Sequence, residues 1–134
     1  TLHTNDAISA ITRLTDMGVE PFLLASTLQG VLAQRLVRKL CQACKISHAD
    51  GTATLNSAGC PQCRFSGYKG RNGIHELFVL DDMLRSMIHS GTDEQGLRAA
   101  ARRNGMRSLR EDGQRWVAQG ISTQEELARV TRDT

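Results

Sequence analysis

Four cysteines, arranged as two closely spaced pairs, constrain this chain more than any other feature of its sequence. Cys41 and Cys44 form one Cys-x-x-Cys pair, Cys60 and Cys63 form the other, and fifteen residues separate the two pairs. This spacing matches the four-thiolate zinc pattern, in which each pair lies in a tight turn that aims both sulfurs at one ion about 2.3 Å away. The sequence therefore predicts a tetrahedral site for zinc.

The alternative is that the cysteines form redox sites or disulfides. Neither pair opens a helix after a strand, as a thioredoxin-like pair would, and secreted disulfide-bonded domains distribute their cysteines more widely along the chain. His48 lies between the pairs and is a rival ligand, but four thiolates already close a structural site. We therefore expect a structural ion without an open coordination position, and His48 in solvent.

The segment from Cys41 to Cys63 is polar and cannot bury a core of its own. About two dozen residues of this composition need the free energy of metal binding in order to fold. Phe65 and Tyr68 follow the second pair closely, and we expect both rings to pack beneath it.

Helical and strand patterns flank this loop. Polar capping residues followed by apolar residues at helical spacing predict a helix over residues 7–17, and a proline predicts a second helix over 21–28. Apolar and β-branched runs predict strands over 31–40 and 74–80, while the glycines of GYKGRNG predict a loop before the second strand. The simplest topology is a β-hairpin with the cysteine loop at its tip.

Residues 81–134 are predicted to form four short helices, which we expect to pack as a small bundle. Capping residues and glycines separate the four apolar stretches, and the last begins with the capping box Ser122–Glu125. Solvated helix faces are the favoured interpretation of the many arginines, and a docking surface for an acidic partner is the alternative. These arginines are Arg98, Arg102, Arg103, Arg107, Arg110 and Arg115.

Charge and length limit the possible functions. The 134-residue chain has a net charge of only +3, which is too small to indicate nucleic-acid binding by itself. The segment from Cys41 to Cys63 contains one lysine and no aromatic residue on which a base could stack. No apolar run approaches the roughly 20 residues of a membrane span. The chain opens on Thr1 without an initiator methionine, and we expect a fragment of a longer protein.

Several segments, in this order along the chain, resemble one known family. They are TLHTNDAISAITRL, GVLAQRLVRKLC, the two cysteine pairs, GYKGRNGIHELF, GMRSLREDG and ISTQEEL. Together they resemble the secretion ATPases of type II secretion and type IV pilus systems. The segments QRLVRKLC and GIHELF resemble the type II component, the general secretion pathway E protein, more than the pilus assembly ATPase. The resemblance covers essentially the whole chain.

The resemblance implies an α+β fold with four parts. Residues 1–40 would be the C-terminal part of a RecA-like ATPase core, and residues 41–69 a zinc-binding insertion. Residues 70–80 would return to the core as the second strand of the hairpin. Residues 81–134 would form a C-terminal helical subdomain.

The resemblance also implies a function for the longer parent protein. Members of this family are homo-hexameric motors that use ATP and Mg²⁺ to extrude a pseudopilus. They act at the cytoplasmic face of the inner membrane, with membrane-platform proteins as partners, and no nucleic acid is expected. A zinc-ribbon module that binds nucleic acid, or an adaptor that binds through its helical tail, is the alternative function.

The family's catalytic residues are mostly outside this sequence. The chain contains no GxxxxGK[ST] phosphate-binding loop, so we expect it to be inactive alone. By resemblance the chain starts within the family's histidine box, which places His3 near the γ-phosphate of ATP as the candidate catalytic residue. The alternative is that His3 only orders the end of a strand and the cap of the next helix.

Overall fold

The computed structural model describes residues 2–132 and divides the chain into two compact units. Unit 1 contains Thr1–Ala33 and Glu76–Ser108, and unit 2 contains Gln34–His75 and Leu109–Thr134. The chain therefore passes between the units within two strands and once more between two helices.

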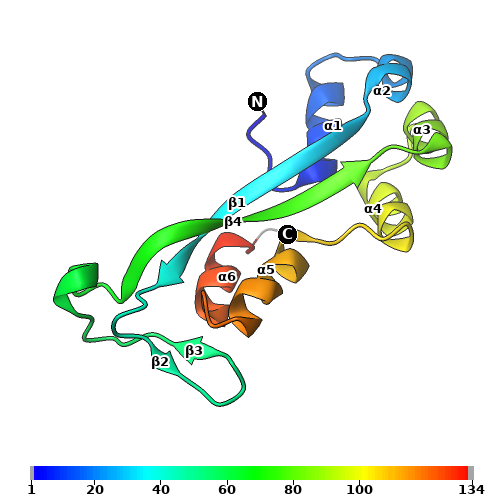
Figure 1. Cartoon of the computed structure of the whole chain (residues 1–134). Helices are drawn as coiled ribbons and strands as arrows, with labels where there is room; N and C mark the ends of the chain where they lie inside the picture. Colours follow the sequence, from blue (N-terminus) through cyan, green and yellow to red (C-terminus); the bar gives the residue numbers. More distant parts are fainter. Residues whose placement is uncertain (1, 133–134) are drawn as a thin grey trace. The chain divides into compact units, whose positions relative to one another are not determined.

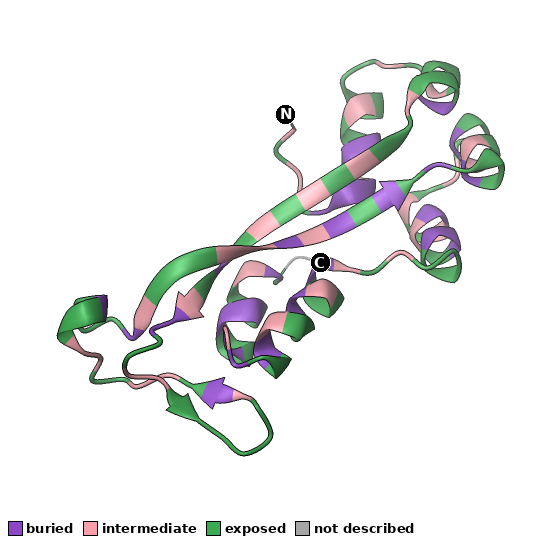
Figure 2. Cartoon of the chain, viewed as in Figure 1, coloured by how far each residue is buried: buried purple, intermediate pink, exposed green. Residues whose placement is uncertain are grey.

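Strands β1 and β4 form an antiparallel two-stranded sheet (Figure 1). Strand β1 spans Gly30–Leu40 and β4 spans Tyr68–Val79. Exposed residues alternate with partly or fully buried ones along much of both strands (Figure 2), as expected for strands that cover a core with one face. The predicted loop at GYKGRNG is wrong, because β4 already begins at Tyr68. Pairing with β1 extends the strand through these glycines, and Gly70 adopts a φ of +81° that few other residues tolerate.

Unit 1 holds four of the helices. Asp6, Asp81 and Asp93 each cap a helix by accepting a hydrogen bond from a backbone N–H in its first turn. Helix α2 begins instead with Pro21, whose missing N–H is not needed at that position. The bounds are α1 Ala7–Asp16, α2 Pro21–Thr27, α3 Asp82–His89 and α4 Glu94–Arg103.

The core of unit 1 lies where α2 and α4 pack on α3, and where α1 packs on α4. The apolar stripes of these helices meet the end of β4, which contributes Phe78. The largest fully buried apolar side chains of this core are Phe78, Ile8 and Leu84. None of the helices within residues 2–132 is long and apolar enough to span a bilayer.

Unit 2 contains helices α5 (Leu109–Ala118) and α6 (Gln124–Val130), which pack on each other and on the strands. Gly113 permits their close approach, because a Cβ atom there would lie 2.2 Å from Leu127 Cδ1. The core consists of five buried side chains: Val37, Ile74, Leu109, Val117 and Leu127.

The prediction of one four-helix bundle is not confirmed. Helices α3 and α4 share the core of unit 1, whereas α5 and α6 share the core of unit 2. The predicted domain limits at residues 40, 69 and 80 stay a prediction. The compact units follow other limits because α5 and α6 bury their apolar faces against Val37 and Ile74.

A buried carboxylate ties α6 to β1 in unit 2. The side chain of Glu126 is 1% exposed and accepts hydrogen bonds from the backbone N–H of Arg38 at 3.0 Å and from its guanidinium at 2.9 and 3.1 Å. Arg129 adds two further bonds, at 2.6 and 3.0 Å. Burial opposes ionisation, but the bonds from Arg129 and Arg38 outweigh it and lower the pKa of Glu126 to about 2.

Glu126→Gln should destabilise the chain by about 2 kcal/mol at neutral pH, because it removes a paired buried charge. The folded pKa of Glu126 lies below its ordinary value of 4.5. Its contribution is therefore complete above pH 4.5 and is lost as the pH falls toward 2. Urea unfolding followed by circular dichroism should show the gap between wild type and variant closing over that range.

Glu125→Gln is the matched control for this experiment, because Glu125 is exposed on the same turn of α6. A metal chelator is present in all samples, so that loss of an ion at low pH does not enter the differences. A gap between wild type and Glu126→Gln that stays constant down to pH 2 would contradict the ion-pair assignment.

Candidate metal centre

The two cysteine pairs lie at the two ends of the β1–β4 connection. Cys41 directly follows β1, and the carbonyl of Cys41 accepts a hydrogen bond from Lys45 N at 3.0 Å, which closes the first turn. Cys60 caps the short 3₁₀ helix η1 (Pro61–Cys63) that carries Cys63. Between the pairs, β2 (Ile46–Ser47) and β3 (Ala53–Thr54) form a small antiparallel hairpin. Backbone turns, rather than a core, therefore position the thiols.

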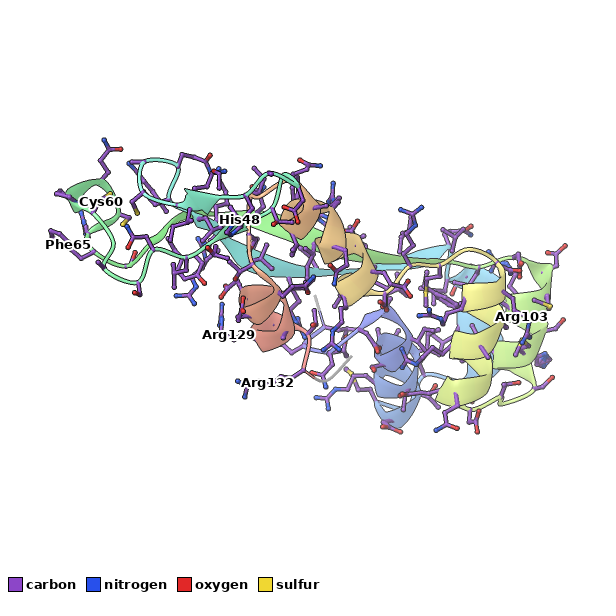
Figure 3. The ribbon with its side chains drawn as sticks, turned by 90° about the horizontal axis from the view of Figure 1, so that it is seen from below. His48, Cys60, Phe65, Arg103, Arg129 and Arg132 are labelled. Atoms are coloured by element: carbon purple, nitrogen blue, oxygen red, sulfur yellow. The ribbon has the colours of Figure 1, made fainter. Side chains whose placement is uncertain are left out.

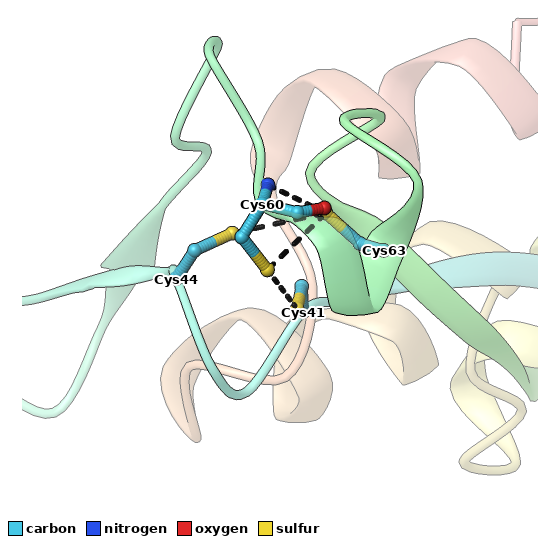
Figure 4. A group of neighbouring side chains, drawn as sticks. All are labelled: Cys41, Cys44, Cys60 and Cys63. Carbon is cyan, nitrogen blue, oxygen red and sulfur yellow. Dashed lines mark hydrogen bonds between the residues drawn. The ribbon is translucent and has the colours of Figure 1, made fainter.

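The four sulfurs converge on one point (Figure 4), as the sequence predicts. All four lie within 4.8 Å of one another. The separations are 3.7 Å for Cys41–Cys60, 3.9 Å for Cys44–Cys63 and 3.8 Å for Cys60–Cys63. A tetrahedral ion with metal–sulfur bonds of about 2.3 Å requires sulfurs about 3.8 Å apart. The cysteines are free thiols and form no disulfide, so this donor set fits a four-coordinate thiophilic cation.

Backbone N–H groups prepare Cys63 to bind a cation. Its sulfur accepts hydrogen bonds from the N–H of Cys60 and of Gly67, both at 3.2 Å. Burial opposes ionisation, but these two N–H groups, together with the thiols of Cys60 and Cys44, outweigh it and lower the pKa of Cys63 to about 6. Burial and the three neighbouring thiols raise the pKa of Cys44 to about 12. Four thiols in this space cannot all ionise unless a cation compensates their charge.

His48 lies apart from the sulfurs, as expected for a residue that is not a ligand. It is exposed in the turn between β2 and β3, and its Nε2 lies 3.2 Å from Thr54 Oγ1. Within residues 2–132, the four cysteines are the group of three or more candidate ligands that meets the geometry of a metal site.

The cysteine loop is fastened to the turn between α5 and α6. Lys45 Nζ donates to the carbonyl of Gly120 at 3.0 Å, and the N–H of Leu40 donates to the carbonyl of Ile121 at 2.8 Å. A Cβ on Gly120 would lie 2.8 Å from the carbonyl oxygen of Gly51, so only glycine permits this approach. No local sequence pattern predicts these contacts, because they join residues far apart along the chain.

The expected packing of Phe65 beneath the second pair is wrong. Phe65 is 64% exposed, and both Arg64 and Phe65 adopt positive φ angles, of 54° and 63°. The left-handed turn that closes around Cys63 directs the Phe65 ring outward. Tyr68 is half-buried instead, with the guanidinium of Arg38 4.1 Å from its ring centre.

His3 lies in unit 1, four residues before α1 begins at Ala7, and two carboxylates anchor the start of that helix. Asp6 accepts bonds from Ser9 N at 2.8 Å and from Arg98 Nη1 at 2.8 Å. Burial opposes ionisation of Asp6, but the bonds from Ser9 and Arg98 lower its pKa. Glu76, 1% exposed on β4, accepts a bond from Ala7 N at 2.9 Å. His3 itself is exposed, so the imidazole is accessible to a ligand.

The comparison with known proteins identifies the family. The family model described as Type II/IV secretion system protein matches residues 1–129. The chain therefore belongs to this family of secretion-system proteins.

Individual relatives match almost the whole chain. Identity is 62% over 133 residues with Type II secretion system protein HxcR of Pseudomonas aeruginosa, covering 99% of this chain and 28% of that protein. It is 45% over 148 residues with Type II secretion system ATPase E of Vibrio cholerae, covering 100% and 29%. It is 46% over 143 residues with Type IV pilus assembly ATPase PilB of Thermus thermophilus, covering 95% and 16%. The chain thus spans less than a third of each of these relatives.

A solved structure shares the fold. The pilus retraction motor PilT with bound ADP superimposes with a TM-score of 0.65 over 99% of this chain and 32% of that one, at 23% identity. This likeness supports the predicted mixed α and β fold.

We predict that the purified chain binds one divalent ion through its four thiolates. Substitution with Co²⁺ should give the intense absorption of tetrahedral thiolate coordination. Cys63→Ser should weaken metal binding by more than about 100-fold, since even changes outside the ligand shell cost roughly 10–100-fold. His48→Ala should bind as the wild type does. Four freely reactive thiols after anaerobic reconstitution with metal would contradict the assignment.

Proposed function

We propose that this chain is the C-terminal part of an ATPase that powers type II protein secretion by assembling a pseudopilus. The observation that carries the proposal is the similarity of the whole chain to type II secretion proteins, at 62% and 45% identity. Two of the relatives are themselves named as ATPases. A motor that assembles a pilus is the closest alternative, since a pilus assembly ATPase matches at 46% identity.

Zinc is the ion that we propose for the cysteine site. Four thiolates at tetrahedral spacing suit Zn²⁺ better than Mg²⁺ or Ca²⁺, which prefer oxygen ligands. The four cysteines complete the coordination shell and leave no position for substrate, so the ion would be structural. Cys41, Cys44, Cys60 and Cys63 would then fold the polar loop and hold it against the turn between α5 and α6.

His3 is the residue of this chain that we propose for the ATPase reaction. The longer protein would supply the phosphate-binding loop and the Mg²⁺ ligands, which this sequence lacks. His3 would contact the γ-phosphate as a hydrogen-bond donor or as an imidazolium. The hydrogen bonds that Asp6 and Glu76 accept from backbone N–H groups in the first turn of α1 would fix the direction from which His3 approaches.

The remaining features of the proposal concern assembly. The longer protein would act as a homo-hexamer at the cytoplasmic face of the inner membrane, bound to platform proteins of the secretion system. We keep the four-part division at residues 40, 69 and 80 as the functional one within that protein. Nucleic acid is not among the proposed partners.

The isolated chain should not hydrolyse ATP, even with Mg²⁺, because nothing in it holds the phosphates in line for attack. The longer protein that contains this sequence should hydrolyse ATP under the same conditions. Phosphate release measured over a range of protein concentrations tests both statements. ATP hydrolysis that copurifies with the isolated chain through a further column would contradict its expected inactivity. A longer protein that forms a hexamer but does not hydrolyse ATP would contradict the expected activity of the parent.

His3→Ala in the longer protein should lower kcat by roughly 10–100-fold, the scale of one lost transition-state contact. Zinc content and hexamer formation should be unchanged, because His3 and the cysteines belong to different units. His89→Ala is the matched control, since His89 is exposed at the end of α3. Unaltered turnover in an assembled His3→Ala hexamer would leave His3 only the role of ordering the helix start.

A further inference from the structure

Phe65 is a large apolar side chain that a hydrogen-bonded turn directs outward. It lies two residues after Cys63, is near Cys60 in Figure 3, and is 64% exposed. Its N–H donates to the carbonyl of Cys60 at 2.9 Å. Its backbone also lies against Gly59, where a Cβ atom would come within 2.4 Å of Phe65 Cα. A scattered exposed apolar residue is ordinary, but this ring has a fixed backbone, which lowers the entropy lost on binding.

Unit 1 contains a pocket of the size that such a ring needs. The pocket has a volume of about 140 Å³ and lies between the second half of α1 and the connection from α3 to α4. An engineered protein cavity of about 150 Å³ binds benzene, so this pocket is large enough for one phenyl ring. Buried apolar side chains form its floor, namely Ile11, Ile88 and Leu97.

The charges around the ring and around the pocket are complementary. The pocket is also lined by Asp16, Asp93 and Glu94. Phe65 directly follows Arg64, which is exposed, and no acidic residue occurs between Cys60 and His75. The tip of the cysteine loop, formed by Arg64 and Phe65, is therefore cationic with one apolar ring. It matches a pocket that is lined by carboxylates and has an apolar floor.

We infer that Phe65 of one copy of this chain inserts into the α1/α3–α4 pocket of a second copy, with Arg64 facing Asp16. The two surfaces are different, so the contact is head-to-tail and repeats from copy to copy, as in a ring. One anchored side chain buries far less than the roughly 1,200 Å² of a stable interface. The contact is therefore weak in the isolated chain and adds to other contacts in a larger assembly. It does not depend on ATP hydrolysis.

The test places p-azidophenylalanine at position 65 and mixes this protein with isotope-labelled wild type before illumination. We expect cross-links from position 65 to peptides that contain residues 11–21 or 88–97 of the labelled copy, identified by mass spectrometry. The same photoreactive residue at position 46 is the matched control, because Ile46 is 51% exposed on the same loop, but its neighbour Lys45 donates to the carbonyl of Gly120 within the chain. Position 46 should give no cross-link to these peptides.

Three variants check the chemistry of the contact. Thr12→Trp, which fills the pocket from its exposed edge, should lower the cross-link yield by about tenfold, as should Arg64→Asp and Asp16→Arg individually. Combining Arg64→Asp with Asp16→Arg in the same chain should restore the yield. Metal content and the circular dichroism spectrum report that each variant is folded.

Three outcomes would overturn the inference. The first is a cross-link that joins position 65 only to peptides of its own, unlabelled chain. The second is a cross-link to another surface, or none at high protein concentration. The third is sedimentation with phosphatidylglycerol vesicles that requires Phe65 while no cross-link between copies forms, which would make the tip a membrane contact instead.

Discussion

The antiparallel pairing of β1 with β4 is the constraint on which the cysteine loop and the core of unit 2 depend. The strands end beside each other, so that the N–H of Cys41 donates to the carbonyl of Gly67 at 2.9 Å and the N–H of Gly67 donates to Cys63 Sγ at 3.2 Å. One sheet therefore brings both cysteine pairs to one place. The same strands supply Val37 and Ile74 to the core that α5 and α6 cover.

Buried carboxylates fix the segments that the apolar cores leave undetermined. Glu76 holds the backbone of Ala7, and Glu126 holds the backbone of Arg38. Neither contact contributes much apolar burial. Leaving such a carboxylate buried without its partner would cost more than the paired contact contributes, so each contact selects one arrangement. Ala7 lies next to the segment that carries His3. Arg38 lies within β1, the strand that leads to the cysteine loop.

The loop that carries the four cysteines is part of unit 2 rather than an independent tip. Lys45 and Gly51 lie against the turn between α5 and α6, so the folding of the loop and the placement of that turn are coupled. A structural ion at the cysteines would therefore act on the C-terminal helices as well as on the loop. Phe65 remains outside this packing, because the left-handed turn at Arg64 directs it away.

The sequence by itself determined the features that depend on neighbouring residues. Asp6, Asp81 and Asp93 cap helices by accepting a hydrogen bond from the N–H three residues later, and the Cys-x-x-Cys spacing forms turns that present paired sulfurs. These interactions are completed within one turn of chain, so local pattern is sufficient to predict them. The family resemblance likewise rests on contiguous segments.

Only the tertiary structure decided which distant segments share a core. It assigned α5 and α6 to the strands of unit 2, extended β4 through the glycines after Tyr68, and exposed Phe65. Each outcome depends on a partner far along the chain, such as Ile121 opposite Leu40 or Leu127 against Gly113. Local propensity is worth only a fraction of a kcal/mol per residue, about 0.5–1 for a glycine in a strand, so backbone pairing and core burial override it.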